Sequence, residues 1–347
     1  MPTEFQDNFL PSGGVREQVN GTHRGFNRRK KISLLWAELP AYIKKPLLKL
    51  TWWGKWKHCR NQDHRFSFTR KDGRISSMTF CGREIAPSVP LHQLTGDFKG
   101  PVTIVATGPS ALNHDWEALK KSGRKIVALT GGCGFLHEKE ITPDLLVVTD
   151  PNFCAVGGFH VLNAVGVPLA IEYRSAVALE KHFPGALAGR RVFMMERVNG
   201  WYGLPRLNDV QLESLNRQWG GPFHISNNSD PWRRSGWSYQ PERGIYPSST
   251  VAFVALELVI ALGATDIEIV GMDLGGSASI YANARPSKLQ EQYESVILPS
   301  FLAMKSALEN RDIHIRNLSP TCPLPADIFQ YSSSIPKEAE KTGCCKP

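Results

Sequence analysis

The chain lacks the long apolar runs that would place it in a membrane or in a secretory pathway. Among its 347 residues, no apolar run approaches the roughly 18 to 20 residues that span a bilayer. The polar start, MPTEFQDNFLPSGG, contains no apolar core of a signal peptide. The sequence therefore predicts a cytoplasmic protein.

Cysteine is sparse, and no two cysteines have the spacing of a metal site. The seven cysteines are scattered along the chain and include no CxxC pair. This excludes the common zinc spacings and predicts reduced thiols. Adjacent Cys344 and Cys345 also suit acylation, but a solvated tail is the preferred interpretation.

The commonest nucleotide-binding signatures are missing too. The chain has no GxGxxG turn and no lysine placed as in a Walker loop. Clustered carboxylates are also absent after the predicted third strand, where Asp150 is followed by Pro151, Asn152 and Phe153. Because hard cations prefer such clusters, the sequence predicts no metal site.

Negative charge is nearly absent from residues 24–60. This segment contains eleven basic residues and one acidic residue, Glu38. The net charge of the whole chain is +9, so this segment accounts for the excess of positive charge. Its tryptophans are Trp36, Trp52, Trp53 and Trp56. Basic residues mixed with aromatic residues favour contact between residues 28–58 and an anionic membrane surface. Nucleic-acid binding and a helix packed on the core are the alternatives.

The stretch Val102–Ser110, VTIVATGPS, organises the rest of the chain. Residues rich in β-branched side chains run into a Thr-Gly-Pro-Ser turn, which predicts a buried strand followed by a helix. The free amides at the start of such a helix suit an anion. The pattern is consistent with a phosphate-binding turn, and an ordinary strand-to-helix turn is the alternative.

Strands alternate with helices from residue 101 onwards. This alternation predicts an α/β, Rossmann-like domain over residues 101–320, with a mostly parallel sheet and helices on both faces. Residues 1–27 are expected to be disordered and residues 321–347 to form an irregular tail. Residues 28–100 are expected to form a basic aromatic extension with a hairpin. The predicted strands are 101–107, 125–130, 144–149, 167–172, 190–195, 266–271 and 312–316. The predicted helices are 113–121, 155–164, 174–183, 248–262 and 287–310.

A lid-like insertion, residues 196–247, interrupts the alternation. A loop-rich segment of about fifty residues is too long for a plain connection. It indicates a lid or an acceptor-binding element. A small packed subdomain with structural tryptophans is the alternative.

The turns after the strands are the most informative, because α/β proteins bind ligands beyond the carboxyl ends of their parallel strands. Four predicted strand ends carry small, Gly-rich or acidic turns. They are Thr107–Ser110, Thr130–Gly134, Thr149–Asn152 and Gly271–Asp273. Together on one edge, they predict a nucleotide-sized cleft.

Three segments resemble those of a known group of bacterial proteins. They are ATGPSAL, PDLLVVTDPNF and YPSSTVAFVALELVIALGATDIEIVGMDL. They resemble the lipooligosaccharide sialyltransferases and a related group of flagellin glycosyltransferases and pterin pyrophosphokinase-like domains, over residues 101–320. The resemblance implies a transferase that moves an acidic sugar, sialic-acid-like or Kdo-like, from a CMP-activated donor to a lipopolysaccharide core or another lipid-linked glycan. It implies no metal and no cofactor.

The resemblance also assigns residues to the nucleotide, with the phosphate on the Gly-Pro-Ser turn. The implied nucleotide-binding residues are Gly108, Pro109, Ser110, Thr130, Asp150, Ser248, Ser249, Thr250 and Asp273. Thr130 stands where the family has asparagine, and Asp150 replaces the asparagine of its Asn-Pro. Hydroxyl and backbone donors of this kind stabilise the charge that develops on a leaving phosphate.

The catalytic base is the weakest part of the resemblance. The family has a histidine late in the domain, but no histidine lies between His224 and His314 here. Tyr281, Arg285 and Lys288 lie near that position and are the catalytic candidates. Arg285 also suits pairing with the carboxylate of the sugar.

Two other functions stay open. A pterin-type pyrophosphokinase needs magnesium and paired carboxylates, which this chain lacks after the third strand. A non-catalytic nucleotide-binding module needs no base. The preferred interpretation is the transferase, at the cytoplasmic face of the inner membrane, with no nucleic-acid partner and no predicted oligomeric state.

Overall fold

The computed structural model describes residues 63, 65–156, 164, 166–203, 206–226, 235–274, 279–280 and 289–331. The basic segment 28–58 lies outside the described residues, as do residues 1–27 and most of the tail. The catalytic candidates Tyr281, Arg285 and Lys288 lie outside them too. What the sequence predicts for these residues therefore stays a prediction.

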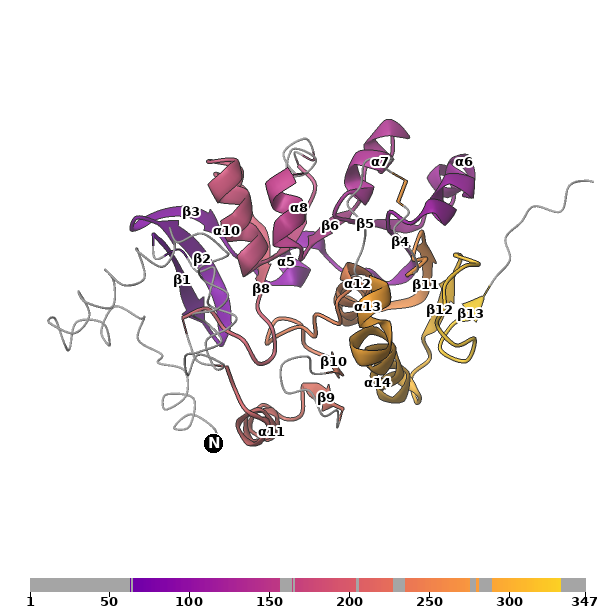
Figure 1. Cartoon of the computed structure of the whole chain (residues 1–347). Coiled ribbons are helices and arrows are strands. Elements are labelled where there is room, and N and C mark those ends of the chain that lie inside the picture. Colours follow the sequence, from indigo (N-terminus) through magenta and orange to yellow (C-terminus); the bar gives the residue numbers. More distant parts are fainter. Residues whose placement is uncertain are drawn as a thin grey trace, which may run out of the picture.

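An eight-stranded sheet forms the centre of the molecule (Figure 1). Its strands are β4 (Gly100–Val105), β5 (Lys125–Leu129), β6 (Leu145–Val148), β7 (Leu169–Glu172), β8 (Val192–Met195), β11 (Ala264–Val270), β12 (His314–Asn317) and β13 (Gln330–Tyr331). Every neighbouring pair is parallel. This confirms the α/β, Rossmann-like fold, and all seven predicted strands exist. The short β13 was not predicted.

The sheet grows from its middle in two directions. Its order is β13-β12-β11-β4-β5-β6-β7-β8, so the chain runs from β4 out to β8 and then returns to place β11 on the other side of β4. The direction of winding therefore reverses between β4 and β11. Such a switch point opens a crevice at the carboxyl ends of the strands, where α/β proteins bind ligands.

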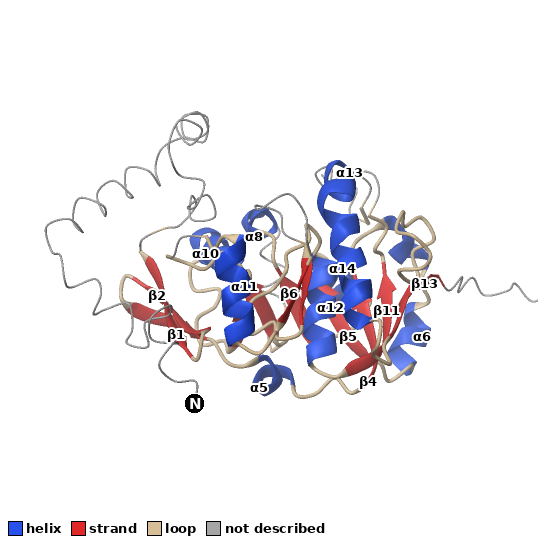
Figure 2. Cartoon of the chain, turned by 90° about the horizontal axis from the view of Figure 1, so that it is seen from below, coloured by secondary structure: helices blue, strands red, loops and turns tan. Residues whose placement is uncertain are grey.

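Helices cover both faces of the sheet. On one face lie α6 (Trp116–Lys121), α7 (Gly132–Glu138), α8 (Pro151–Val156) and α10 (Tyr173–His182). On the other face lie α12 (Val251–Ala261) and α14 (Leu298–Leu308), as Figure 2 shows. Because side chains alternate along a strand, Val105 and Ala128 pack with the first group, and Ile104 and Val127 with the second.

Three helical predictions differ in detail from the structure. The predicted helix 155–164 overlaps α8 only at residues 155 and 156, and residues 157–163 lie outside the described residues. The predicted helix 287–310 consists of α13 (Leu289–Gln292), a π-helical turn (Tyr293–Ile297) and α14. The predicted helix 113–121 is divided into the 3₁₀ helix η2 (Pro109–Asn113) and α6. Asp115 separates these two, because its carboxylate accepts from Ala118 N at 2.9 Å and caps α6.

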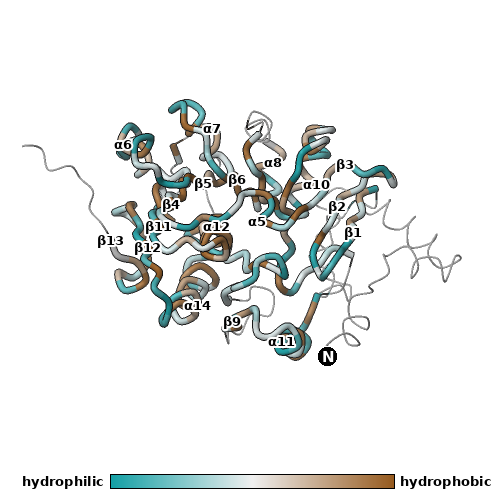
Figure 3. The backbone as a smooth tube through the Cα atoms, turned by 180° about the vertical axis from the view of Figure 1, so that it is seen from behind, coloured by the Kyte–Doolittle hydropathy of each residue, from teal (hydrophilic) through white to brown (hydrophobic). Residues whose placement is uncertain are grey.

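Helix α12 is apolar on all sides apart from one buried glutamate, Glu257. Its sequence, VAFVALELVIA, is typical of a helix enclosed by protein rather than one with a solvent face. Its residues from Ala252 to Val259 are all buried, and Figure 3 shows the helix in the colour of hydrophobic residues. The helix therefore holds a fixed position against the centre of the sheet.

The N-terminal described segment is an antiparallel meander of β1 (Phe66–Lys71), β2 (Arg74–Phe80) and β3 (Arg83–Pro87). The hairpin around Asp72 and Gly73 is confirmed, and the third strand was not predicted. Ser88 pairs with Val192 of β8. Five meander residues belong to a core cluster of the parallel sheet: Phe66, Phe68, Ile75, Met78 and Ala86. The predicted boundary at residue 101 therefore does not separate two cores.

The described part of the insertion is a packed subdomain. It contains α11 (Asp209–Gln218) and a ribbon of β9 (Phe223–Ile225) and β10 (Gly236–Ser238). Trp237 and Tyr246 are fully buried and belong to the main core. The described part of residues 196–247 is therefore packed against the main core. No helix within the described ranges has the length and apolar character needed to cross a membrane.

Candidate functional site

The predicted turns meet at the carboxyl edge of the sheet. The turns after β4, β5, β6 and β11 follow four adjacent strands. The C-terminal end of α12 leads directly into β11, so the helix runs antiparallel to the strands and begins at the same edge. The start of α12, with Ser248, Ser249 and Thr250, therefore joins these turns.

Strained backbone is concentrated at this edge. Four non-glycine residues there have positive φ angles: Thr130 (42°), Ser248 (25°), Ser249 (63°) and Leu274 (53°). Each such conformation costs on the order of 1 to 3 kcal/mol and is typical of ligand-binding sites. Strain at several turns of one edge favours a binding site there.

The Gly-Pro-Ser turn does not offer the free amides expected of it. Gly108 N donates to Gly271 O at 2.8 Å, and Ala111 N donates to Gly108 O at 3.1 Å. Ser110 N donates to Asp273 Oδ2 at 3.0 Å, and Pro109 has no amide hydrogen. An internal carboxylate thus takes the position expected for the phosphate. The predicted phosphate contact at Gly108–Ser110 is not supported by this geometry.

Close packing, and not an unusual backbone conformation, explains the glycine at position 108. Its φ of −71° is accessible to any residue. A Cβ atom at this position would overlap Asp273 Oδ2 and lie 2.5 Å from Gly271 O. The glycine therefore allows the close approach of the β11 turn, not a left-handed conformation.

Asp273 joins three segments and lines no open surface. Its side chain is buried, and Oδ1 accepts from Thr321 Oγ1 at 2.8 Å. Ser110 and Ser319 share a hydrogen bond between their hydroxyls at 2.9 Å. The carboxylate thus ties the turns after β4 and β11 to the segment after β12.

The start of α12 is the better anion site. Thr250 caps the helix, with its hydroxyl accepting from Ala252 N at 3.3 Å. No other side chain in the described part of the chain accepts from the first-turn amides of α12. Ser249 is exposed, and Ser248 is buried with its Oγ unpartnered among the described residues. The helix therefore presents backbone donors and hydroxyls to a ligand.

Thr130 and Asp150 lie at the same edge with local roles. Thr130 is half-buried and begins the turn into α7, a helix that the sequence did not predict. This turn packs tightly, because a Cβ on Gly132 would lie 2.7 Å from Val105 O. Asp150 Oδ1 accepts from Asn152 N at 2.8 Å at the start of α8. Both residues therefore lie at the carboxyl edge of the sheet.

The segment before the catalytic candidates is anchored at this edge. Ile280 N donates to Thr107 O at 3.0 Å, and Ser279 Oγ donates to the same oxygen at 3.2 Å. Thr107 follows β4 directly. The chain therefore enters residues 281–288 from beside the switch point.

A charged group at the ends of β7 and β8 was not found from the sequence. Glu172 is fully buried and binds both Arg174 and Arg197. Burial raises the pKa of the Glu172 carboxyl, but the two arginines outweigh it, so its pKa lies below the ordinary value. Residues just after parallel strands are candidates for ligand binding, and that criterion applies to this group as well. The group was missed because the turns after β7 and β8 lack the Gly-rich pattern of the other four.

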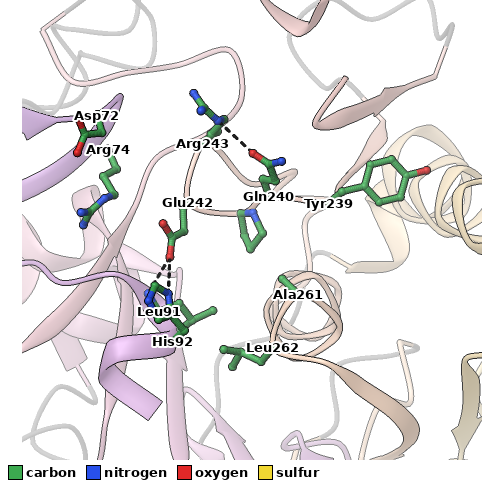
Figure 4. A pocket seen from close by; sticks show the side chains of 11 residues that line it. Asp72, Arg74, Leu91, His92, Tyr239, Gln240, Glu242, Arg243, Ala261 and Leu262 are labelled. Carbon is green, nitrogen blue, oxygen red and sulfur yellow. Dashed lines mark hydrogen bonds and ion pairs between the residues drawn. The ribbon is translucent and has the colours of Figure 1, made fainter. Parts of the chain in front are cut away.

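A cavity of about 400 Å³ lies elsewhere in the molecule (Figure 4). It is lined by the β1–β2 turn, by α5 (Leu91–Thr95), by residues 239–243 and by the end of α12. Glu242 points toward His92 and accepts from Leu91 N at 3.0 Å. The end of α12 precedes β11, so the cavity lies at the amino edge, away from the candidate site.

No group of three or more His, Cys, Asp or Glu within the described ranges is placed to hold a metal ion. Cys133 and Cys154 are buried near the candidate edge, and burial raises the pKa of their thiols to about 11 and about 12. These thiols are therefore protonated at neutral pH. No family model matches the chain, and no curated protein matches it either.

Proposed function

We propose that the protein is a glycosyltransferase that binds a CMP-activated acidic sugar at the carboxyl edge of its sheet. The observation that carries the proposal is the start of α12, where strained Ser248 and Ser249 precede a helix whose first-turn amides, apart from that of Ala252, donate to no side chain among the described residues. This start lies at the edge where the switch point opens. In this proposal the phosphate binds Ser248–Thr250, and the turn of Gly108–Ser110 forms the adjoining wall.

The chemistry fits such a site. When the sugar leaves, negative charge develops on the nucleotide phosphate, and helix amides and hydroxyls stabilise that charge. The acceptor hydroxyl loses its proton to a base, for which Tyr281 and Lys288 remain the candidates, and Arg285 suits pairing with the carboxylate of the sugar. We propose a lipopolysaccharide core or another lipid-linked glycan as the acceptor.

The test is a panel of ligands with the full-length protein. Melting temperatures are measured with CMP, CTP, ATP and UDP, because a ligand at a hundred times its Kd stabilises by about 2.7 kcal/mol. Transfer is then assayed with CMP-sialic acid and CMP-Kdo, with and without EDTA. A CMP-dependent rise and EDTA-resistant transfer support the proposal. Magnesium-dependent pyrophosphate transfer from ATP would support the pyrophosphokinase, and binding without transfer would support a non-catalytic module.

We further propose that residues 28–58 dock the protein on the inner membrane. Eleven basic residues against one acidic residue in residues 24–60 attract anionic headgroups. The contact should weaken with salt, because exposed charges are screened over about 8 to 10 Å at physiological ionic strength. Co-sedimentation with anionic and neutral vesicles tests it, with a chain lacking residues 1–60 as the control. Equal binding of both chains would refute it.

A further inference from the structure

We propose that Arg174 and Arg197 form a second anion-binding subsite at the carboxyl ends of β7 and β8. Its ligand is a carboxylate or phosphate group of the molecule in the cleft. Only the identity of that molecule rests on the proposed function. The subsite itself rests on the geometry of the two guanidinium groups.

The two guanidinium groups are fixed by one buried carboxylate. Arg174 Nε and Nη2 donate to Glu172 Oε1 and Oε2 at 2.7 and 2.8 Å. Arg197 Nε donates to Glu172 Oε1 at 3.0 Å. Within the described residues, Arg174 Nη1 and both Nη atoms of Arg197 have no hydrogen-bond acceptor. The side chains are 24% and 23% exposed, so neither is completely enclosed by the described residues.

The charge of this group favours another anion. Two guanidinium groups share one carboxylate, and burial together with the neighbouring Arg174 lowers the pKa of Arg197. Asp150 lies close enough to Arg174 to raise the pKa of that arginine, so it offsets part of the excess. Glu196 does not offset this positive charge, because its carboxylate pairs with Arg70 at 2.6 Å. The positive charge of Arg197 is therefore the one with least compensation.

The subsite lies near the start of α12. The backbone of Arg197 pairs with Ile245, and Ile245 N donates to Glu196 O at 2.9 Å. Ser248 follows three residues later, which is at most about 10 Å of extended chain. One ligand can therefore place a phosphate on α12 and a second anionic group on the arginines.

A planar carboxylate suits this arrangement. Arginine presents its donors as a fork that matches the two oxygens of a carboxylate or phosphate. A sugar acid offers such a carboxylate, and a diphosphate offers a second phosphate instead. A neutral sugar offers neither, so the subsite would select for donors with two anionic groups.

The experiment separates the subsite from the nucleotide site. Binding to the full-length protein is measured by calorimetry for N-acetylneuraminic acid, its neutral methyl ester, inorganic pyrophosphate and CMP. The variant is Arg197→Gln, because Arg174 keeps both of its hydrogen bonds to Glu172. The matched control is Arg191→Gln, an exposed arginine before the amino end of β8. Melting curves check that each variant is folded.

We expect the acid or pyrophosphate to bind at least tenfold more tightly than the methyl ester. We expect Arg197→Gln to remove this difference, Arg191→Gln to keep it, and CMP affinity to stay within about threefold. Comparing the affinity of N-acetylneuraminic acid with that of pyrophosphate shows whether the subsite prefers a carboxylate or a phosphate. If Arg197→Gln fails to fold, Arg197→Lys should weaken anion binding, because it keeps the charge but not the fork.

Two results would overturn the subsite: equal binding of the acid and its ester with no binding of pyrophosphate, or unchanged anion binding in both Arg197 variants. Failure of CMP to bind, with anion binding intact and dependent on Arg197, would instead remove the nucleotide assignment and leave the subsite.

Discussion

The buried Glu257 makes the stability of this protein depend on pH in a way that one substitution can isolate. Glu257 is fully buried in α12. Its Oε1 accepts from Ser238 N at 2.8 Å, and Tyr246 N donates to both oxygens, to Oε2 at 3.1 Å and to Oε1 at 3.3 Å. Tyr246 lies two residues before Ser248, so this carboxyl group helps to hold the start of α12. We expect Glu257→Gln to stabilise the protein at neutral pH.

The sign follows from the direction of the pKa shift. Burial raises the pKa of Glu257 well above its ordinary value of 4.5, although the two backbone hydrogen bonds oppose the change. Below pH 4.5 the carboxyl is protonated in both states, and its full contribution is present. Above that pH the unfolded chain ionises first, so this group removes up to about 1.4 kcal/mol of stability per pH unit until the folded pKa is reached.

Glutamine keeps the shape of the neutral carboxyl and cannot ionise. Its oxygen can accept from both amides, so the variant should match the wild type near pH 4.5 and exceed it increasingly up to the folded pKa. Glu257→Ala is the contrasting variant. It leaves two buried amides unpaired, at about 1 to 3 kcal/mol each, and should be less stable at low pH.

Urea unfolding from pH 4.5 to 8 measures the difference between the wild type and Glu257→Gln. Other groups titrate in the same way in both proteins, so they cancel. A difference that does not change with pH would refute the reasoning. The reasoning would also be refuted if the stability of the wild type rose relative to that of the variant as the pH rises.

Three further predictions concern the carboxyl edge and the meander. Gly108→Ala should destabilise by about 1 to 3 kcal/mol in urea unfolding, because its Cβ overlaps Asp273; an unchanged midpoint would contradict this. Thr250→Val should cost about 1 kcal/mol through loss of the cap of α12, and an unaltered stability would show that the cap is unimportant. At Asp63, burial raises the pKa, but hydrogen bonds from Arg65 and Lys181 outweigh it and hold the pKa well below 3.8. This carboxylate therefore stabilises above pH 3.8 and loses its contribution in more acid solution, so Asp63→Asn should be less stable at pH 7 and should approach the wild type in acid.

Most strands of the parallel sheet follow from local sequence, since they are short apolar runs between polar turns, whereas β12 (HIRN) and β13 (QY) are not apolar. Helix α7 did not follow from local sequence, because Gly132 and Gly134 have low helix propensity and resemble a loop. Close packing of this turn on Val105 O explains the small residue at Gly132. That contact joins two strands and has no local signal.

The turns of the candidate site lie after adjacent strands, as the sequence predicts, but their hydrogen bonds could not be predicted. The hydrogen bond between Ser110 and Asp273 joins residues 163 positions apart, so the turn alone could not reveal that its donor is occupied. Glu172 and Arg197 are 25 positions apart and pair only because β7 and β8 are neighbours. Contacts of this kind depend on topology, which a single sequence does not specify.

The claim that a nucleotide phosphate binds the start of α12 is tested most directly at Ser249, which is exposed and has a φ of 63°. Asparagine and aspartate both tolerate this conformation, and they differ in charge. An aspartate here also suits the helix dipole, so the fold should persist while the phosphate is repelled. CMP affinity is measured by calorimetry for the wild type, Ser249→Asn and Ser249→Asp. We predict that Ser249→Asn binds within about threefold of the wild type and Ser249→Asp at least tenfold more weakly; equal affinity of all three proteins would contradict the proposed site.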